Sequence, residues 1–218
     1  MLTISDGILL PLGWFAKCDI PSPEVQTYAE QVPGKDGEYY FGSNYGPRVI
    51  PLELTSPRLT KDTKEAEYQK LMDTFKEDVT VSYEGVFFKG RVSPEIDAIN
   101  LPHCITATVP LKLLDPFLWD ENELTTNDTI ENKGNMITCP IIEIYNATNP
   151  TITIGESTLS YTGTCVSLVI DCEKQTAKDN GVNVIHNISG DYPLIKPGQI
   201  VNVESPNSFK VTWKNRYL

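Results

Sequence analysis

The last ten residues, 209–218, constrain the fold of this 218-residue chain most strongly. A strand places alternate side chains on opposite faces, whereas a helix would spread the same side chains around its circumference. The segment therefore predicts a strand with an apolar face toward a core, Trp213 included, and a basic face toward solvent. The alternation pairs Phe209, Val211, Trp213 and Tyr217 with Lys210, Thr212, Lys214 and Arg216, and only Asn215 interrupts it.

Turn signals separate short apolar runs before this strand. Asp179-Asn180-Gly181 marks one turn, and Pro197-Gly198 has type II turn chemistry because proline sets φ and glycine tolerates positive φ. A third turn is expected at 205–208. The C-terminal half is therefore predicted to be all β, with strands at 166–171, 182–185, 199–203 and 209–217.

The N-terminal half shows one helical pattern among strands. Residues 61–78 repeat apolar side chains at helical spacing, and Asp62 and Glu65 have the spacing of a capping box. We expect this helix to cover a sheet, and we expect a hairpin turn at Tyr83–Val86. The predicted strands are 48–55, 79–85, 86–92 and 104–114.

Residues 16–45 are less regular, because prolines and glycines interrupt them, and we expect a long loop or excursion there. Its aromatic residues allow two interpretations. We favour burial in the core, and the alternative is contact with a neighbouring subunit, because Tyr and Phe are enriched at interfaces. The candidate subunit-interface residues are Tyr39, Tyr40, Phe41 and Tyr45.

Composition indicates a globular chain without a nucleic-acid or membrane partner. Hydrophobic residues make up 40% and charged residues 22%. The net charge of −11 is spread over both halves, with −7 in residues 1–120 and −4 in 121–218, so no basic patch neutralises phosphates. No apolar run is long enough to span a membrane, and the N-terminus lacks the basic region of a signal peptide. The N-x-S/T patterns at Asn127, Asn146 and Asn187 are interpreted as chance matches.

The cysteines and histidines do not have the spacing of a disulfide framework or a zinc site. Five cysteines, an odd number without a C-x-x-C pair, indicate free thiols in a reducing compartment, and Cys104 is expected to be a small buried apolar residue. The two histidines are too few for usual zinc ligation. A distant dyad of Cys172 and His186 is the weaker alternative to inert thiols.

No motif of an enzyme is present. Asp171 and Glu173 share a strand face, but a glycosidase pair lies across a cleft, so we interpret them as a solvated edge or a turn contact. Phosphate-binding and dinucleotide-binding glycine patterns and the nucleophile elbow are missing. We therefore predict no catalytic residues, no metal and no cofactor.

Three blocks of sequence resemble the distal tail proteins (Dit) of long-tailed phages. They are the segment from "LVIDCEKQTAKDNGVN" to "FKVTWKNRYL", "DGEYYFGSNYGPRVIPLELT" with Arg48 heading a strand, and "LKLLDPFLWD". The blocks cover most of the chain, and their order and spacing carry the resemblance, since strand and turn patterns alone recur in many β proteins.

The resemblance implies a mainly β fold with two β-sandwich-like domains. Residues 1–120 would form a ring-forming N-terminal domain with the helix at about 62–78, and residues 121–218 a galectin-like β-sandwich. It also implies a virion structural protein of a phage or prophage, assembled in the bacterial cytoplasm and located at the tail tip. Its partners would be five further copies in a hexameric baseplate hub, the tail tube protein, the tail-tip or tail-associated protein and a receptor-binding protein.

The rival class is a carbohydrate-binding module that acts without a ring. Trp119 or Trp213 could stack on a sugar, although the alternation favours core packing for Trp213. A galactoside site generally needs His, Asn, Arg and Trp together, and the C-terminal half has one histidine and one arginine. We therefore expect this half to dock protein rather than sugar.

Overall fold

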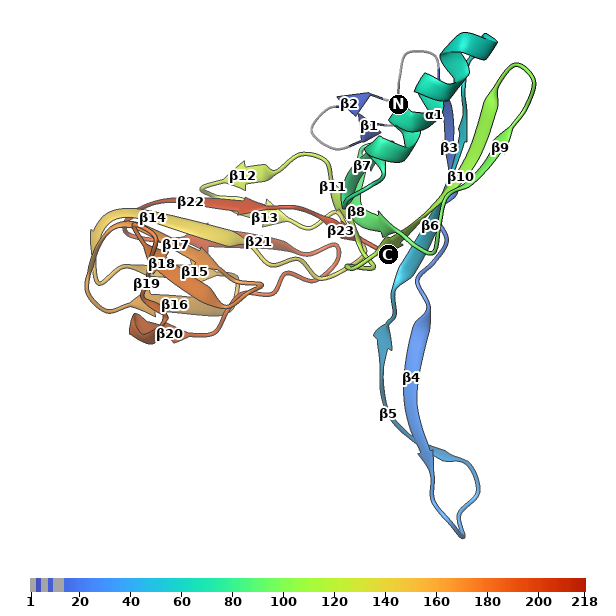
Figure 1. Ribbon diagram of the computed structural model, residues 1–218. Coiled ribbons are helices and arrows are strands. Elements are labelled where there is room, and N and C mark those ends of the chain that lie inside the picture. The colour runs from blue at the N-terminus through green and yellow to red at the C-terminus, as the bar shows by residue number, and fades with distance from the viewer. Residues whose placement is uncertain (1–2, 5–7, 10–13) are drawn as a thin grey trace. The chain divides into compact units, whose positions relative to one another are not determined.

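The computed structural model describes residues 3–4, 8–9 and 14–218. Its described part is mainly β, with one α-helix and one 3₁₀ helix, which confirms the predicted fold class (Figure 1). Contacts divide the chain into two compact units, Met1–Leu118 with Leu218, and Trp119–Tyr217. None of the described helices is both long and apolar enough to cross a membrane.

The N-terminal unit is built on one antiparallel sheet. Its strands follow the order β2-β1-β7-β8-β10-β6-β3, and β9 pairs with β10. A separate two-stranded sheet joins β4 to β5 and extends beyond the end of β6 (Figure 1). The bounds are β1 Thr3–Ile4, β2 Ile8–Leu9, β3 Phe15–Cys18, β4 Val25–Gln31, β5 Glu38–Tyr45, β6 Arg48–Thr55, β7 Val79–Tyr83, β8 Val86–Val92, β9 Asp97–Asn100 and β10 Ile105–Leu113.

Strands β6 and β10 form the centre of this sheet. They pair along their whole length, from Thr106 opposite Thr55 to Leu113 opposite Arg48. Every second residue of each strand is buried, as the alternation in the sequence predicts. The hairpin of β7 and β8 was also predicted correctly, because Glu84 and Gly85 both have the positive φ that a two-residue turn requires.

The helix α1, Lys61–Thr74, ends four residues earlier than predicted. Glu77 and Asp78 follow its end, where the negative end of the helix dipole disfavours carboxylates. Asp78 instead accepts a hydrogen bond from Arg91 Nε at 2.6 Å. The predicted capping pair was also wrong, since Thr63 Oγ1 accepts the backbone N–H of Thr60 at 3.1 Å.

Arg48, the first residue of β6, is an anomaly in the core of this unit. The side chain lies on the buried face of the strand, and only 1% of its surface is exposed. Its three guanidinium nitrogens have no hydrogen-bond partner among the described residues, and burial lowers the pKa of the group. A buried charge without a partner destabilises the isolated fold.

Replacing this guanidinium should therefore stabilise the isolated chain. We expect Arg48→Met to raise the free energy of unfolding by about 1–4 kcal/mol, because apolar replacements of buried charges are often stabilising. Urea unfolding measures the change. The exposed Arg58→Met serves as control and should have little effect. A clear loss of stability in Arg48→Met would show that the charge has a favourable partner in solution.

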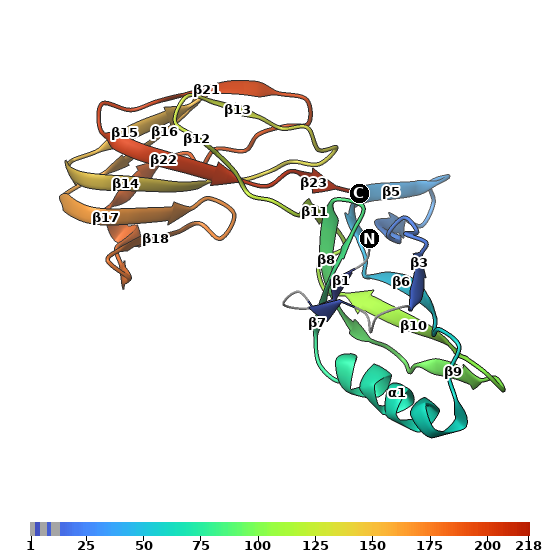
Figure 2. The ribbon, with the colours of Figure 1, turned by 90° about the horizontal axis from the view of Figure 1, so that it is seen from above.

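The C-terminal unit is a sandwich of two antiparallel sheets (Figure 2). One sheet has the order β12-β22-β14-β17-β18-β19 and the other β13-β21-β15-β16-β20, while β11 pairs with β23. The bounds are β11 Leu118–Asp120, β12 Leu124–Thr126, β13 Thr129–Glu131, β14 Ile141–Thr148, β15 Thr151–Ile154, β16 Ser157–Tyr161, β17 Thr164–Asp171, β18 Thr176–Asp179, β19 Val182–Asn183, the 3₁₀ helix Ile185–Asn187, β20 Ile188–Gly190, β21 Ile200–Glu204, β22 Ser208–Trp213 and β23 Arg216–Tyr217.

Side chains from both sheets form the core of the sandwich. Ile142, Ile144, Leu168 and Ile170 come from one sheet, and Ile152 belongs to the other. The strand predicted at 182–185 is only two residues long, because the 3₁₀ helix begins at residue 185.

The C-terminal segment agrees with the prediction in part. Val211 and Trp213 are buried and Lys210 is exposed, as expected. The strand breaks at residues 214–215, where Asn215 is buried. The expectation that Arg216 lies outside was wrong, since its guanidinium lies 4.5 Å from the ring centroid of Trp119 and 3.0 Å from the Glu173 carboxylate.

Trp213 should be essential to the stability of the sandwich. It is 92% buried, and its indole N–H donates to the carbonyl of Glu131 at 3.3 Å. We expect Trp213→Ala to cost about 3–5 kcal/mol, which is enough to unfold a marginal domain. Chemical denaturation tests this, with the exposed Ile200→Ala as control. A normal unfolding midpoint for Trp213→Ala would contradict the packing role.

Candidate functional site

The hairpin of β4 and β5 carries the aromatic residues that the sequence singled out. Val25 lies opposite Tyr45 at its base, Ala29 opposite Tyr40, and Glu30 opposite Tyr39. Tyr39 and Tyr40 therefore point to opposite faces of the hairpin. The pairing shifts between Tyr28 and Ala29 because Phe41 is an extra residue in β5.

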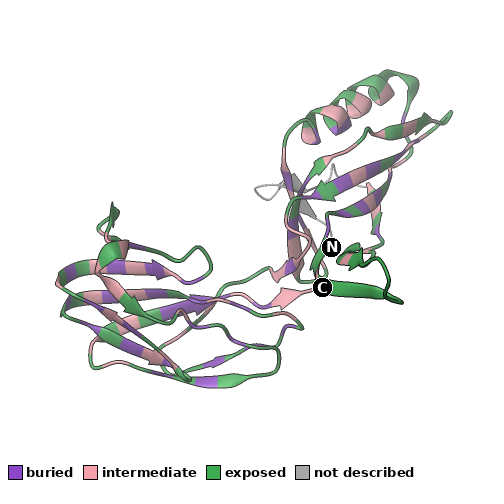
Figure 3. Ribbon diagram, turned by 90° about the horizontal axis from the view of Figure 1, so that it is seen from below, coloured by how far each residue is buried: buried purple, intermediate pink, exposed green. Residues whose placement is uncertain are grey.

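The interpretation of these aromatics as core was wrong. Tyr40 is 64% and Phe41 68% exposed, and Tyr39 and Tyr45 are exposed as well. Figure 3 colours much of this hairpin as exposed. Their segment is also a paired hairpin and not the long loop that its prolines suggested. Among the described residues, no further strand or helix forms a second layer against this two-stranded sheet, and its side chains are mostly exposed. Contact with a neighbouring subunit remains a prediction for these four residues.

The base of the hairpin is fixed to its unit by an aromatic contact. The rings of Tyr45 and Phe117 meet edge to face with centroids 5.7 Å apart. Toward the tip, the Tyr40 hydroxyl donates to Ser43 Oγ at 2.9 Å, and the ammonium group of Lys35 lies 3.9 Å from the ring centroid of Tyr39. The hairpin thus presents a fixed base and an exposed aromatic arm.

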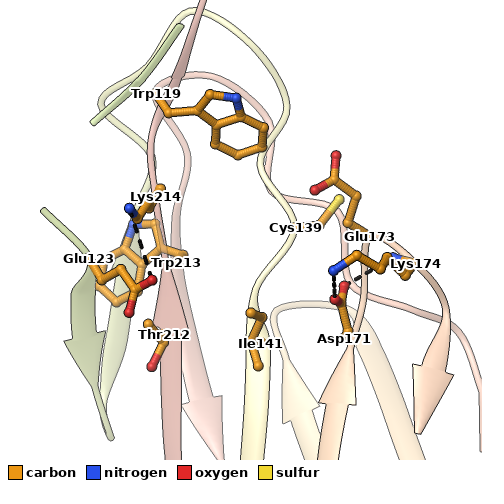
Figure 4. A pocket seen from close by; sticks show the side chains of 10 residues that line it. All are labelled: Trp119, Glu123, Cys139, Ile141, Asp171, Glu173, Lys174, Thr212, Trp213 and Lys214. Atoms are coloured by element: carbon orange, nitrogen blue, oxygen red, sulfur yellow. Dashed lines mark hydrogen bonds and ion pairs between the residues drawn. The ribbon is translucent and has the colours of Figure 1, made fainter. Parts of the chain in front are cut away.

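A cavity of about 120 Å³ opens at one end of the C-terminal sandwich (Figure 4). It lies where β14 begins and where β17 and β22 end, and Trp119 of β11 borders it. Ile141 lies toward its floor in the close-up. The remaining lining residues are Glu123, Cys139, Asp171, Glu173, Lys174, Thr212, Trp213 and Lys214.

Three ion pairs border this cavity. Lys174 Nζ lies 2.7 Å from Asp171 Oδ2, Lys214 Nζ lies 3.9 Å from Glu123, and Glu173 pairs with Arg216. Burial opposes the ionisation of Asp171, but hydrogen bonds from Lys174 outweigh it, and the pKa of this carboxyl lies below its usual range. A general acid needs a raised pKa, so Asp171 is suited to binding and not to acid catalysis.

A close backbone contact positions Arg216 beside the cavity. The backbone of residue 134 lies against that of residue 216, and a Cβ on Gly134 would meet the Arg216 carbonyl oxygen at 2.3 Å. Only glycine fits this approach. The amide of Asn132, which is fully buried, accepts the N–H of Gly134 at 2.9 Å and holds the turn in place.

Burial makes three of the five thiols poorly suited to a reactive site. Burial raises the pKa of Cys18 to about 11 and raises the pKa of Cys139 and, above all, of Cys172. A thiol in its protonated form is a poor nucleophile and metal ligand. Among the described residues, no group of three or more His, Cys, Asp or Glu could hold a metal ion.

These pKa values predict slow thiol modification. All five cysteines are free, so five thiols should react with a disulfide reagent in denaturant. In the folded protein at pH 8, Cys18 should react about a thousandfold more slowly than an unfolded thiol, because its thiolate is scarce and its side chain is buried. Stopped-flow absorbance and mass mapping measure the rates. Rapid labelling of Cys18 or Cys172 in the folded state would contradict the burial.

Comparison with solved structures connects this fold to phage tails. No protein-family model matches the sequence, and a search of curated proteins finds no match. The chain is similar to the Dit protein of phage SPP1, described as a paradigm of the hub adsorption apparatus in phages that infect Gram-positive bacteria. The TM-score is 0.78 at 15% identity, and the alignment covers 100% of both chains. The resemblance inferred from the sequence is therefore confirmed at the level of the fold.

Two structures of the phage P2 baseplate in its activated conformation, with Ca and with Sr, also match. Their TM-scores are 0.47 and 0.49, at 7% and 8% identity, and each alignment covers 91% of this chain. The alignments cover 90% and 89% of those chains.

Proposed function

We propose that this protein is a non-enzymatic structural component of a phage or prophage tail tip, in which six copies form the hub of the baseplate. The observation that carries the proposal is the fold match to the SPP1 Dit protein over the full length of both chains. The fold alone does not define the function. The exposed hairpin gives the proposal independent support.

The hairpin supports assembly because its surface is unsuited to an isolated chain. Strands of seven and eight residues present aromatic side chains to solvent on both faces. A two-stranded hairpin is at best marginally stable in water, and its outer edges leave backbone groups free to pair. Contact with another protein would cover the aromatics and these edges.

A closed ring needs two different patches on each subunit. We propose that residues 1–120 form the ring through the hairpin, with Tyr39, Tyr40, Phe41 and Tyr45 at the contact. In this proposal, residues 121–218 are a galectin-like sandwich. The hub would join the tail tube protein to the tail-tip and receptor-binding proteins, after assembly in the bacterial cytoplasm.

The oligomeric state tests this proposal. We expect a concentration-dependent mixture of monomer and hexamer of the 24.3 kDa chain. The reason is that the tube and tip proteins, which would hold the ring together in the tail, are absent from the purified sample. Light scattering measures the mass, and negative-stain microscopy should show six-fold rings. A mass of one or two chains at high concentration, without rings on grids, would contradict the hub.

Hairpin variants locate the contact. Tyr40→Ser with Phe41→Ser should abolish the rings and leave the free energy of unfolding of the monomer within about 0.5 kcal/mol of the parent, because both side chains are exposed. Val182→Ser with Ile200→Ser is a matched control, since these residues of the C-terminal unit are 67% and 66% exposed. Rings that survive the hairpin variant would place the contact elsewhere.

A further inference from the structure

A row of exposed side chains crosses the centre of the N-terminal sheet, where β6, β10 and β8 are neighbours (Figure 1). Val49 of β6 lies directly opposite Lys112 of β10, and Lys112 lies opposite Arg91 of β8. Residues that are opposite in register point to the same face of a sheet, and Ile50 and Leu111, one position along, point into the core. The row therefore lies on the outer face of the sheet, where all three of its side chains are exposed.

This outer face carries positive charge that its own unit neutralises only in part. Lys89 lies two residues before Arg91 on β8 and shares its face. Among the described residues, Asp78 alone lies within ion-pair distance of these cations, 2.6 Å from Arg91 Nε and 4.0 Å from Lys89 Nζ. Lys112 has no ion pair in the described part of the chain, so three cations and one carboxylate leave two positive charges. We call Val49, Lys89, Arg91 and Lys112 the basic patch.

The hairpin of β4 and β5 carries the opposite charge. Within residues 25–45 the carboxylates are Glu30, Asp36 and Glu38 and the one cation is Lys35, which leaves two negative charges. None of these carboxylates has an ion pair among the residues that the structure describes. Glu38 and Tyr40 lie two residues apart on β5, so a carboxylate and an aromatic ring share one face of the hairpin.

Apolar side chains accompany the charges on both surfaces. Val49 of the basic patch is 43% exposed, and Leu114, which is 79% exposed, lies just beyond the end of β10. The hairpin offers the exposed rings of Tyr40 and Phe41. Protein interfaces combine aromatic residues in their centre with complementary charges. The basic patch and the hairpin therefore match in charge and in apolar character.

The hairpin and the basic patch of one chain lie apart. Only Gly46 and Pro47 separate the end of β5 from the start of β6, and the hairpin extends beyond that end of β6, away from the sheet that bears the basic patch (Figure 1). Strands of seven and eight residues span about 25 Å, whereas three neighbouring strands span about 10 Å. The hairpin of another copy is therefore long enough to cross the basic patch completely.

We propose that the hairpin of one copy lies on the basic patch of the next copy, with its carboxylates beside the lysines and its aromatic side chains on Val49 and Leu114. Each copy then gives one hairpin and receives one, and these are the two different patches that a closed ring needs. The inference rests on the proposed hub and adds to it the surface that receives the hairpin. It makes assembly dependent on charge, so rings should weaken as salt screens the contact.

Charge reversal on each surface tests the contact. The hairpin variant is Asp36→Lys with Glu38→Lys, and the patch variant is Lys89→Glu with Lys112→Glu. Each variant alone should need at least about tenfold more protein than the parent for half-assembly into rings, because like charges then face each other. Light scattering over a range of concentrations measures this. Both monomers should keep the free energy of unfolding of the parent, since all four side chains are exposed.

An equimolar mixture of the two variants should form rings again. The basic hairpin of the first variant meets the acidic patch of the second, and the acidic hairpin of the second meets the basic patch of the first. Copies of the two variants must then alternate, which a ring of six allows. Native mass spectrometry should find three copies of each variant in the restored ring.

Matched controls separate the contact from general effects of charge. Glu156→Lys with Glu204→Lys makes the same change of charge as the hairpin variant, on exposed residues of the C-terminal unit. Lys178→Glu with Lys196→Glu does the same for the patch variant. Both controls should form rings at the same protein concentration as the parent.

The possible failures of the hub and of this contact are distinct. If the parent forms rings and the patch variant forms them equally well, the hairpin docks elsewhere, and the hub proposal stands. If both variants are defective but their mixture does not recover, the two surfaces do not contact each other, and this inference is overturned. A parent that never exceeds two chains at high concentration overturns the hub, and the contact with it.

Discussion

The end of the C-terminal sandwich depends on the buried side chain of Asn215. Its amide nitrogen donates to Asp120 at 2.7 Å, and its amide oxygen accepts the backbone N–H of Lys133 at 3.0 Å. One side chain thus joins three segments that lie far apart in the sequence. Its buried groups are all satisfied, and a fully satisfied polar network in the core specifies a single arrangement.

The geometry of the cavity follows from this network. The last strand breaks at residues 214–215, and the side chain of Arg216 lies beside Glu173 and Trp119. The Tyr217 hydroxyl then donates to Asp120 Oδ1 at 2.9 Å, which fixes the strand that carries Trp119. The Trp119 ring that borders the cavity is therefore held by the guanidinium of Arg216 and by the hydrogen bond of Tyr217 to the adjacent Asp120. Its position does not depend on a ligand.

The candidate contact residues of the two units are exposed in different ways. In the sandwich, the candidate site is a cavity in a folded framework. In the N-terminal unit, the aromatic side chains of the hairpin of β4 and β5 are exposed in the part of the chain that the structure describes, and the contact of Tyr45 with Phe117 fixes the base of the hairpin. The first arrangement suits a small ligand, and the second suits a partner that supplies the missing layer.

Much of the framework could be predicted from local patterns. Strand β6 alternates buried and accessible residues as its sequence does, and the turn at Glu84-Gly85 follows from the positive φ that its residues tolerate. These features depend on neighbours in the chain. The hairpin aromatics misled the prediction because composition identifies apolar side chains but does not show whether another layer covers them.

The candidate site could not be predicted, because the residues that line it lie far apart in the sequence. Trp119, Cys139, Asp171 and Thr212 come from four different segments and meet only after the sandwich forms. Alternation correctly assigned Trp213 to the core, but it also placed Arg216 in solvent. That error arose because the strand breaks at residues 214–215, and the local pattern carries no sign of the distant partners of Asn215, which are Asp120 and Lys133.

Two of the ion pairs around the cavity have one largely exposed partner each. Lys174 and Glu123 are largely exposed, and exposed pairs contribute about 0–1 kcal/mol to stability. The buried apolar core between the two sheets supplies the stability instead.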